Sequence, residues 1–107
     1  MRYDCVCEVD DILPDTGVCA RLGARHVAVF RVGDDRFYAI DNVDPKSGAS
    51  VLARGLVGSA GERVVVASPL YKNRFDLGSG ECLDAPEQSV RCHAVKVDAG
   101  RVYVALR

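Results

Sequence analysis

Several features that mark other protein classes are missing from this chain of 107 residues. No apolar run is long enough to cross a membrane, and the first residues lack the apolar stretch of a signal peptide. The net charge is only -1, so there is no strong basic footprint for nucleic acid or anionic lipid. A chain of this length is expected to form one core. We therefore expect a single cytoplasmic domain over residues 1–107, with neither nucleic acid nor a membrane as its partner.

Disulfides and the common metal motifs are also not expected. The chain has 5 cysteines, an odd number, and no Cys-x-x-Cys motif. Cys5 and Cys7 stand two apart on a predicted strand, so they would share one face and could together bind a metal ion. Small thiols more often pack in the core as hydrophobic side chains. Cys92 and His93 are adjacent, so their side chains should point to opposite faces of a strand. We expect five free thiols.

The chain does contain a succession of short β-strands. They alternate with turn signals and are predicted at residues 3–8, 18–22, 26–32, 36–42, 56–57, 62–67, 74–77, 81–83, 95–98 and 102–106. The segment from Val27 to Phe30 is apolar throughout, which is typical of a central strand. Residues 14–17 and 58–61 are predicted turns, and residues 51–55 a single helical turn. The pattern indicates an all-β fold, either a small sandwich or a barrel-like stack.

The most specific pattern lies between residues 67 and 83. A β-branched strand leads into Ser68-Pro69-Leu70-Tyr71, and Arg74-Phe75-Asp76-Leu77 turns through Gly78-Ser79-Gly80 into Glu81-Cys82-Leu83. This order resembles the second ligand loop of Rieske [2Fe–2S] domains, and Asp44-Pro45-Lys46-Ser47-Gly48-Ala49 resembles their first loop. The resemblance implies a Rieske-like antiparallel β-sandwich, with a degenerate, hairpin-rich subdomain at residues 43–83 in place of the cluster-binding subdomain.

All four positions that would supply ligands in a Rieske domain are substituted. The resemblance places Asp44 and Ser68 at the two cysteine positions, and Lys46 and Tyr71 at the two histidine positions. A Rieske cluster needs two thiolates and two imidazoles. A lysine ammonium has no free lone pair, and hydroxyl groups are poor ligands for soft metals near neutral pH. We therefore expect no metal, no cofactor and no catalytic residue on this chain.

A finer resemblance covers nearly the whole length. Residues 39–49 and 51–58, residues 66–72, Phe75-Asp76-Leu77 and Cys82-Leu83-Asp84 look like the small subunit of assimilatory NADH-dependent nitrite reductases. This implies an enzyme subunit of nitrate assimilation that binds and supports a large subunit. In that family the large subunit carries FAD, a [4Fe–4S] cluster and sirohaem and reduces nitrite to ammonium. Whether the small subunit also moves electrons, and whether the complex prefers NADH or NADPH, stays open.

The two loops should form an exposed tip. Its candidates for binding the large subunit are Lys46, Leu70, Tyr71 and Lys72, an apolar and aromatic centre with cationic neighbours. Alternatively, Leu70 and Tyr71 fold inward and fill the space of the cluster. Burying a large apolar side chain contributes about 1.5–3 kcal/mol and an exposed ion pair about 0–1. We predict that Tyr71 packs toward the first loop, and that an ion pair of Asp44 with Lys46 or Lys72 adds a weaker restraint.

Two other function classes are compatible with the sequence. One is a regulatory or interaction module of another oxidoreductase. The other is a ferredoxin-type electron carrier with unusual ligands such as Cys5, Cys7 and Cys82. A separate active site is the least favoured. The nearest acidic candidates are Asp41, Asp44 and Asp76, and no His, Ser or metal completes an acid-base or nucleophilic set with them.

Overall fold

The computed structural model describes residues 2–107 and is almost entirely β-structure. Within that range the elements, in chain order, are β1 (Asp4–Glu8), the 3-10 helix η1 (Val9–Asp11), β2 (Thr16–Leu22), β3 (Arg25–Val32), β4 (Arg36–Asp41), the 3-10 helix η2 (Leu52–Arg54), β5 (Leu56–Ala60), β6 (Arg63–Ala67), β7 (Arg74–Asp76), the 3-10 helix η3 (Pro86–Gln88), β8 (Cys92–Asp98) and β9 (Arg101–Ala105). No helix in this part of the chain is long and apolar enough to span a membrane.

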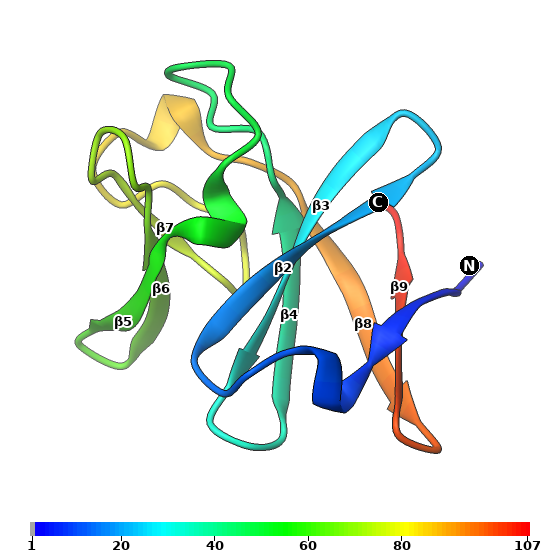
Figure 1. Cartoon of the computed structure of the whole chain (residues 1–107). Helices are drawn as coiled ribbons and strands as arrows, with labels where there is room; N and C mark the ends of the chain where they lie inside the picture. Colours follow the sequence, from blue (N-terminus) through cyan, green and yellow to red (C-terminus); the bar gives the residue numbers. More distant parts are fainter. Residues whose placement is uncertain (1) are drawn as a thin grey trace.

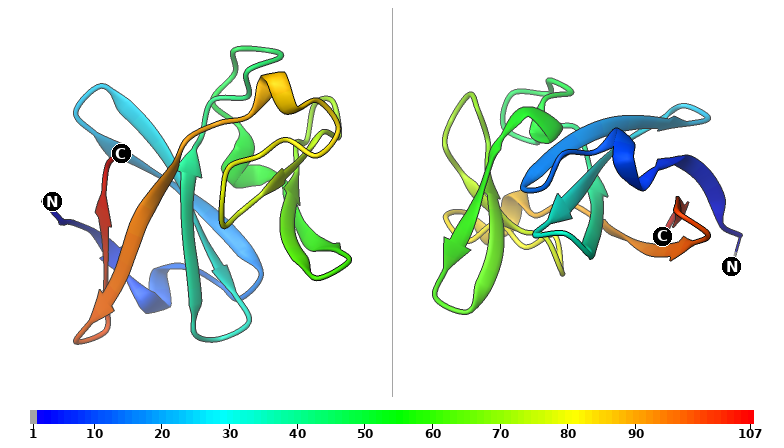
Figure 2. Two further views of the ribbon diagram at one scale, coloured as in Figure 1. Left: turned by 180° about the vertical axis from the view of Figure 1, so that it is seen from behind. Right: turned by 60° about the horizontal axis from the view of Figure 1, so that its bottom comes forward.

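The strands form two antiparallel sheets (Figure 1). Across residues 2–107 the larger sheet has six strands in the order β1-β9-β8-β4-β3-β2, and the smaller has three in the order β5-β6-β7. The views in Figure 2 place the smaller sheet to one side of the larger one, with β1 and β9 at the opposite side. The predicted antiparallel all-β fold is confirmed, and the smaller sheet falls inside residues 43–83.

Strand β3 is buried on both faces and separates two hydrophobic clusters. Ala28, Phe30 and Val32 pack in the cluster that the two sheets share, where they meet side chains of η2, β6 and β7. Val27 and Val29 point the other way and pack in a second cluster with side chains of β4 and β9. The prediction of a central strand is therefore confirmed, since β3 pairs with β2 on one side and β4 on the other.

Three strand predictions were wrong, two of them at glycines. Strand β2 begins at Thr16, within a predicted turn, because Gly17 pairs with Phe30 in register. Strand β5 continues to Ala60, beyond its predicted end, because Gly58 pairs with Val65. Residues 81–83 make only an isolated bridge, from Cys82 to Phe75. Glycine in the sequence signals a turn, but the partner strand decides whether the backbone stays extended.

A β-bulge in β1 changes the predicted placement of the first two cysteines. Cys5 pairs with Tyr103 and Cys7 with Val102, so Val6 is an extra residue in the ladder. Neighbouring residues of β9 face opposite ways, and Cys5 is exposed while Cys7 packs against the second cluster. The prediction that these two thiols share one face was wrong. Burial, followed by the nearby charges of Asp11 and Cys5, raises the pKa of the Cys7 thiol.

Candidate functional site

Two loops at one end of the molecule form the candidate site. We call residues 43–50 the first loop, residues 68–73 the second loop, and both together the tip; they lie at the top of Figure 1. In the first loop, the amide of Gly48 donates to the carbonyl of Asp44 at 2.7 Å. In the second, the amide of Lys72 donates to the carbonyl of Ser68 at 3.0 Å. Each loop is thus a hydrogen-bonded turn that begins at Asp44 or Ser68, the residues that the resemblance places at the cysteine positions of a Rieske domain.

Those two positions are joined by a hydrogen bond. The Ser68 hydroxyl donates to Oδ2 of Asp44 at 2.5 Å, and both residues have 0% exposure. The other carboxyl oxygen, Oδ1, accepts the backbone N–H of Lys46 at 2.9 Å. No ion pair to Asp44 occurs within residues 2–107. The predicted ion pair with Lys46 or Lys72 was therefore wrong, because Asp44 points inward while both lysines stay exposed.

Lys46 and Tyr71, which the resemblance places at the histidine positions of a Rieske domain, also contact each other. The Nζ of Lys46 lies over the ring of Tyr71, 4.6 Å from its centroid. This is cation–π geometry, and it connects the outer parts of the two loops. Tyr71 therefore packs toward the first loop, as the sequence predicted. It is not buried there, since 49% of its surface remains exposed.

The tip presents an apolar patch with cations around it. Leu70 is 51% exposed beside Tyr71, and Lys46 and Lys72 are exposed as well. Lys72 has a φ of 63°, a left-handed conformation that is uncommon outside glycine. That conformation closes the second loop directly after Tyr71. The four candidate residues thus lie together on one surface, and neither Leu70 nor Tyr71 fills the interior in the way that the alternative prediction required.

The side chains at the four positions do not fit a Rieske cluster. Asp44 and Ser68 are hydrogen-bonded to each other, and Lys46 offers a cation to the Tyr71 ring in place of a lone pair. Within residues 2–107, no three His, Cys, Asp or Glu side chains are close enough to hold a metal ion. Among the cysteines suggested as unusual ligands, Cys82 is buried in the shared cluster, whereas Cys5 and Cys7 lie on the edge strand β1.

Ion pairs stabilise the hairpin that follows the second loop. Arg63 donates to Asp76 at 2.6 Å and to Glu81 at 2.5 Å, and Arg74 donates to Asp84 at 2.9 Å. Burial acts to raise the pKa of Asp76, but the hydrogen bonds from Arg63 and two backbone amides outweigh it and lower the pKa. The hydrogen bond from Arg74 likewise lowers the pKa of Asp84.

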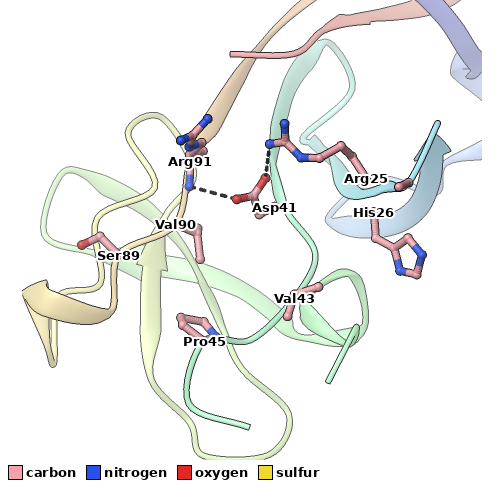
Figure 3. A pocket seen from close by; sticks show the side chains of 9 residues that line it. Arg25, His26, Asp41, Val43, Pro45, Ser89, Val90 and Arg91 are labelled. Carbon is pink, nitrogen blue, oxygen red and sulfur yellow. Dashed lines mark hydrogen bonds and ion pairs between the residues drawn. The ribbon is translucent and has the colours of Figure 1, made fainter. Parts of the chain in front are cut away.

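A cavity of about 530 Å³ lies beside the first loop (Figure 3). Asp41 forms its polar centre and accepts from Arg25 at 3.3 Å and from the backbone N–H of Arg91 at 3.4 Å. The sequence did not reveal that His93 also contacts Asp41, with 2.8 Å between Nε2 and Oδ1. No local pattern signals this pair, because it depends on β4 and β8 meeting in register.

The His93–Asp41 pair faces the interior. Nδ1 of His93 accepts the backbone N–H of Arg107 at 3.0 Å, so the neutral ring carries its proton on Nε2 and donates it to Asp41. The His93 side chain has 0% exposure. A fully buried ring with both nitrogens engaged cannot reach a substrate, so the pair stabilises the junction of β4 and β8.

Comparisons with known proteins agree with this geometry. Residues 2–105 match the model of a family described as Rieske-like [2Fe-2S] domain. The nitrite reductase (NADH) small subunit of Escherichia coli strain K12 is 46% identical over 98 residues, which cover 91% of this chain and 91% of that protein. A crystal structure of a Mycobacterium tuberculosis protein, assigned as the small subunit of an NADH-dependent nitrite reductase, has a TM-score of 0.93 at 41% identity and covers 99% of this chain and 96% of that one.

One relative contains the same unit inside a longer chain. The nitrite reductase [NAD(P)H] large subunit of Klebsiella oxytoca is 48% identical over 102 residues, which are 95% of this chain but 11% of that protein. This chain therefore corresponds to a small part of that protein and to nearly all of the Escherichia coli small subunit. It belongs to the Rieske-like [2Fe-2S] domain family and, within it, to the small subunits of NADH-dependent nitrite reductases.

Proposed function

We propose that this chain is a non-catalytic subunit that binds and supports the large subunit of an NADH-dependent nitrite reductase, and that the tip is its docking surface. The observation that carries the proposal is the pairing of the four substituted positions. Asp44 bonds to Ser68 inside the tip, and Lys46 covers Tyr71 outside it. The tip is therefore ordered by its own side chains and free to present an aromatic surface to a protein partner.

The composition of the tip supports a protein partner. Half-exposed Leu70 and Tyr71 give an apolar centre, and the neighbouring Lys46 and Lys72 give a charged rim. Aromatic residues are enriched at the centres of interfaces, and charges tolerate the solvated rim. The cations favour a partner surface that carries carboxylates near an apolar depression.

The Klebsiella oxytoca relative supports the choice of partner. In that protein, a segment 48% identical to this chain is part of a nitrite reductase large subunit. Covalent linkage keeps two units at a high effective concentration, so it suits units that work in contact. We propose that separate chains achieve the same contact through the tip.

The cofactors of the complex belong to the partner in this proposal. The family resemblance implies FAD, a [4Fe–4S] cluster and sirohaem on the large subunit, with reduction of nitrite to ammonium there. NADH is a reductant of the cell interior, which supports a cytoplasmic location for the complex. The role of this chain is then assembly and stabilisation of the partner, without a redox centre of its own.

Coexpression with the large subunit tests the proposal. Nitrite-dependent NADH oxidation and copurification should both require this chain. Tyr71→Ala should weaken copurification by more than about tenfold, whereas Tyr71→Phe should retain it. Tyr103→Ala is the matched control, because Tyr103 also carries a lysine over its ring, Lys96 at 5.7 Å, but lies on β9 outside the tip.

Three results would contradict the proposal. One is undiminished binding by Tyr71→Ala, which would move the interface away from the tip. Another is an equal loss of copurification in Tyr71→Ala and Tyr103→Ala, which would indicate a general effect of removing an aromatic ring. The third is stoichiometric iron and sulfide in the purified chain, which would make it an electron carrier.

A further inference from the structure

A second cavity, of about 500 Å³, lies between β2 and η2, next to the end of the first loop. Arg21 and Arg54 stand at its walls together with His26 and Ser50, and Asn42 lies below them. We call this cavity the β2–η2 pocket. Its volume is within the range of pockets that take small ligands.

The charge around the β2–η2 pocket has one sign. No Asp or Glu lines it among the described residues, and neither arginine makes a side-chain hydrogen bond or ion pair within residues 2–107. The cavity beside the first loop differs, because there Arg25 is already neutralised by Asp41 (Figure 3). Arg21 and Arg54 are exposed residues at the edge of the β2–η2 pocket, and their guanidinium groups have no counter-charge there.

The pocket also has an unused hydrogen-bond donor. Nδ1 of His26 and Oγ of Ser50 are 2.8 Å apart, and Ser50 accepts from the Asn42 amide at 2.7 Å. A neutral imidazole and a hydroxyl have two protons between them, and their mutual hydrogen bond uses one. Whichever tautomer is present, one N–H or O–H of the pair stays free. Figure 3 shows the His26 ring directed away from the Arg25–Asp41 pair.

The floor of the pocket is rigid. Asn42 is only 1% exposed. Its side-chain Oδ1 accepts the backbone N–H of Ala53 at 2.7 Å, and its side-chain Nδ2 also donates to Sγ of Cys19 at 3.4 Å. These bonds connect β2, the end of β4 and η2 through one side chain. Ser50, and His26 through it, are consequently positioned before any ligand arrives, which reduces the entropic penalty of binding.

We propose that the β2–η2 pocket binds an oxyanion, free or carried by a small organic molecule. Arg21 and Arg54 provide the counter-charge, because a guanidinium matches the oxygens of a phosphate or carboxylate with two parallel N–H groups. The free donor of the His26–Ser50 pair contacts a further oxygen. Ser50 is the one lining residue that also belongs to the tip, whereas the four docking candidates Lys46, Leu70, Tyr71 and Lys72 do not line the pocket.

Titration of the isotope-labelled full chain tests this site, with inorganic phosphate, nitrite and acetate as probes and chloride at equal ionic strength as the reference. Backbone amide shifts should change saturably at residues 17–21, 26 and 50–54 with at least one oxyanion and not with chloride. The double variant R21Q/R54Q should weaken the apparent affinity by more than about tenfold. R36Q/R101Q is the control, because it removes the same charge from two exposed arginines outside the pocket.

The outcomes separate the proposal from general electrostatics. Equal weakening in the two double variants would show diffuse attraction and overturn it. Shifts that grow linearly with each salt, without saturation, would do the same. Intact amide dispersion of R21Q/R54Q without ligand establishes that the variant is folded. Saturation by phosphate alone, by nitrite alone or by acetate alone identifies the shape of anion that the pocket takes.

Discussion

The carboxyl group of Asp44 is fully shielded from solvent, and each of its oxygens depends on one donor. Ser68→Ala removes the donor to Oδ2, so a buried acceptor would lose its partner. Such a loss costs about 1–3 kcal/mol. We expect the free energy of unfolding in urea to fall by that amount.

Ser59→Ala is the control for this change, since Ser59 is exposed on β5. It should lower the free energy of unfolding in urea by less than about 0.5 kcal/mol. Equal stability of wild type and Ser68→Ala would mean that the carboxyl group finds another donor and that the bond does not join the loops.

A double-mutant cycle on Lys46 and Tyr71 measures the outer contact. The half-exposed ring of Tyr71 contributes about half the value of full burial, near 1 kcal/mol, plus a cation–π contribution of about 0.5–1. Tyr71→Ala should therefore destabilise by about 1–2 kcal/mol, and Lys46→Ala by about 0.5. The double variant should resemble Tyr71→Ala, because the lysine acts through the ring. Strict additivity in urea denaturation would refute the contact.

The resemblance assigned the four substituted ligand positions from the sequence, but it did not give their partners. It places Lys46 where a Rieske domain has a histidine, yet it does not show that the ammonium turns to Tyr71. Likewise, it does not show that Asp44 prefers a hydroxyl to a nearby lysine. The choice depends on which side chains the two loops bring within a few ångströms, and that is a property of the folded chain.

At the scale of single elements, Gly55 limits how η2 meets β6. A Cβ there would collide with the carbonyl oxygen of Ala67 and lie 2.7 Å from Cγ2 of Val66. Gly55→Ala should therefore destabilise by about 1–3 kcal/mol through overpacking. Gly58 lies three residues further on, in β5, and the space around its Cβ position is open. Gly58→Ala should therefore change the free energy of unfolding by less than about 0.5 kcal/mol. Equal thermal midpoints of the two variants would contradict this account.

The hairpin behind the tip predicts a dependence of stability on pH. Because the pKa of Asp76 is lower in the folded chain than its ordinary 3.8, the native state binds fewer protons than the unfolded state near that pH. Its stabilisation is complete above about pH 5 and disappears as pH falls through the lowered folded pKa. Asp76→Asn should cost about 1–3 kcal/mol near neutrality, and the difference from wild type should narrow below about pH 4. Urea unfolding at several pH values measures this difference in the free energy of unfolding between wild type and Asp76→Asn. A difference that does not change with pH would disprove the linkage.

Strand identity was predictable from the continuous apolar run of β3 and from the alternation in β8 and β9. Strand ends and the bulge in β1 were not, because they depend on the partner strand. The helical turn at η2 was predicted from Gly55, which does end it, although in an extended conformation with φ of -72°. Turn chemistry identifies where a chain can bend, and cross-strand pairing determines where it does.

For the whole molecule, the cluster shared by the two sheets predicts joint unfolding. Phe30 and Ile40 of the larger sheet pack in this cluster with Phe75 of β7 and with Leu77, which directly follows β7. We propose that residues 1–107 form a single domain. An isolated 43–83 fragment should show the circular dichroism of an unfolded chain, because it lacks the side chains of β3 and β4. The full chain should give coincident urea transitions by circular dichroism and tyrosine fluorescence. A folded fragment, or two separated transitions, would contradict the proposal.

The hydrogen bond between Asp44 and Ser68 has a consequence for a complex that handles electrons. An iron–sulfur cluster gains negative charge each time it is reduced, and the loops around it carry that change to whatever they touch. A hydroxyl and a carboxyl group have no oxidation states to alternate between at biological potentials. A tip held together by this hydrogen bond keeps the same shape and charge before and after each electron transfer in a partner subunit. If the tip docks to the large subunit as proposed, its affinity for that subunit should therefore stay constant throughout the catalytic cycle.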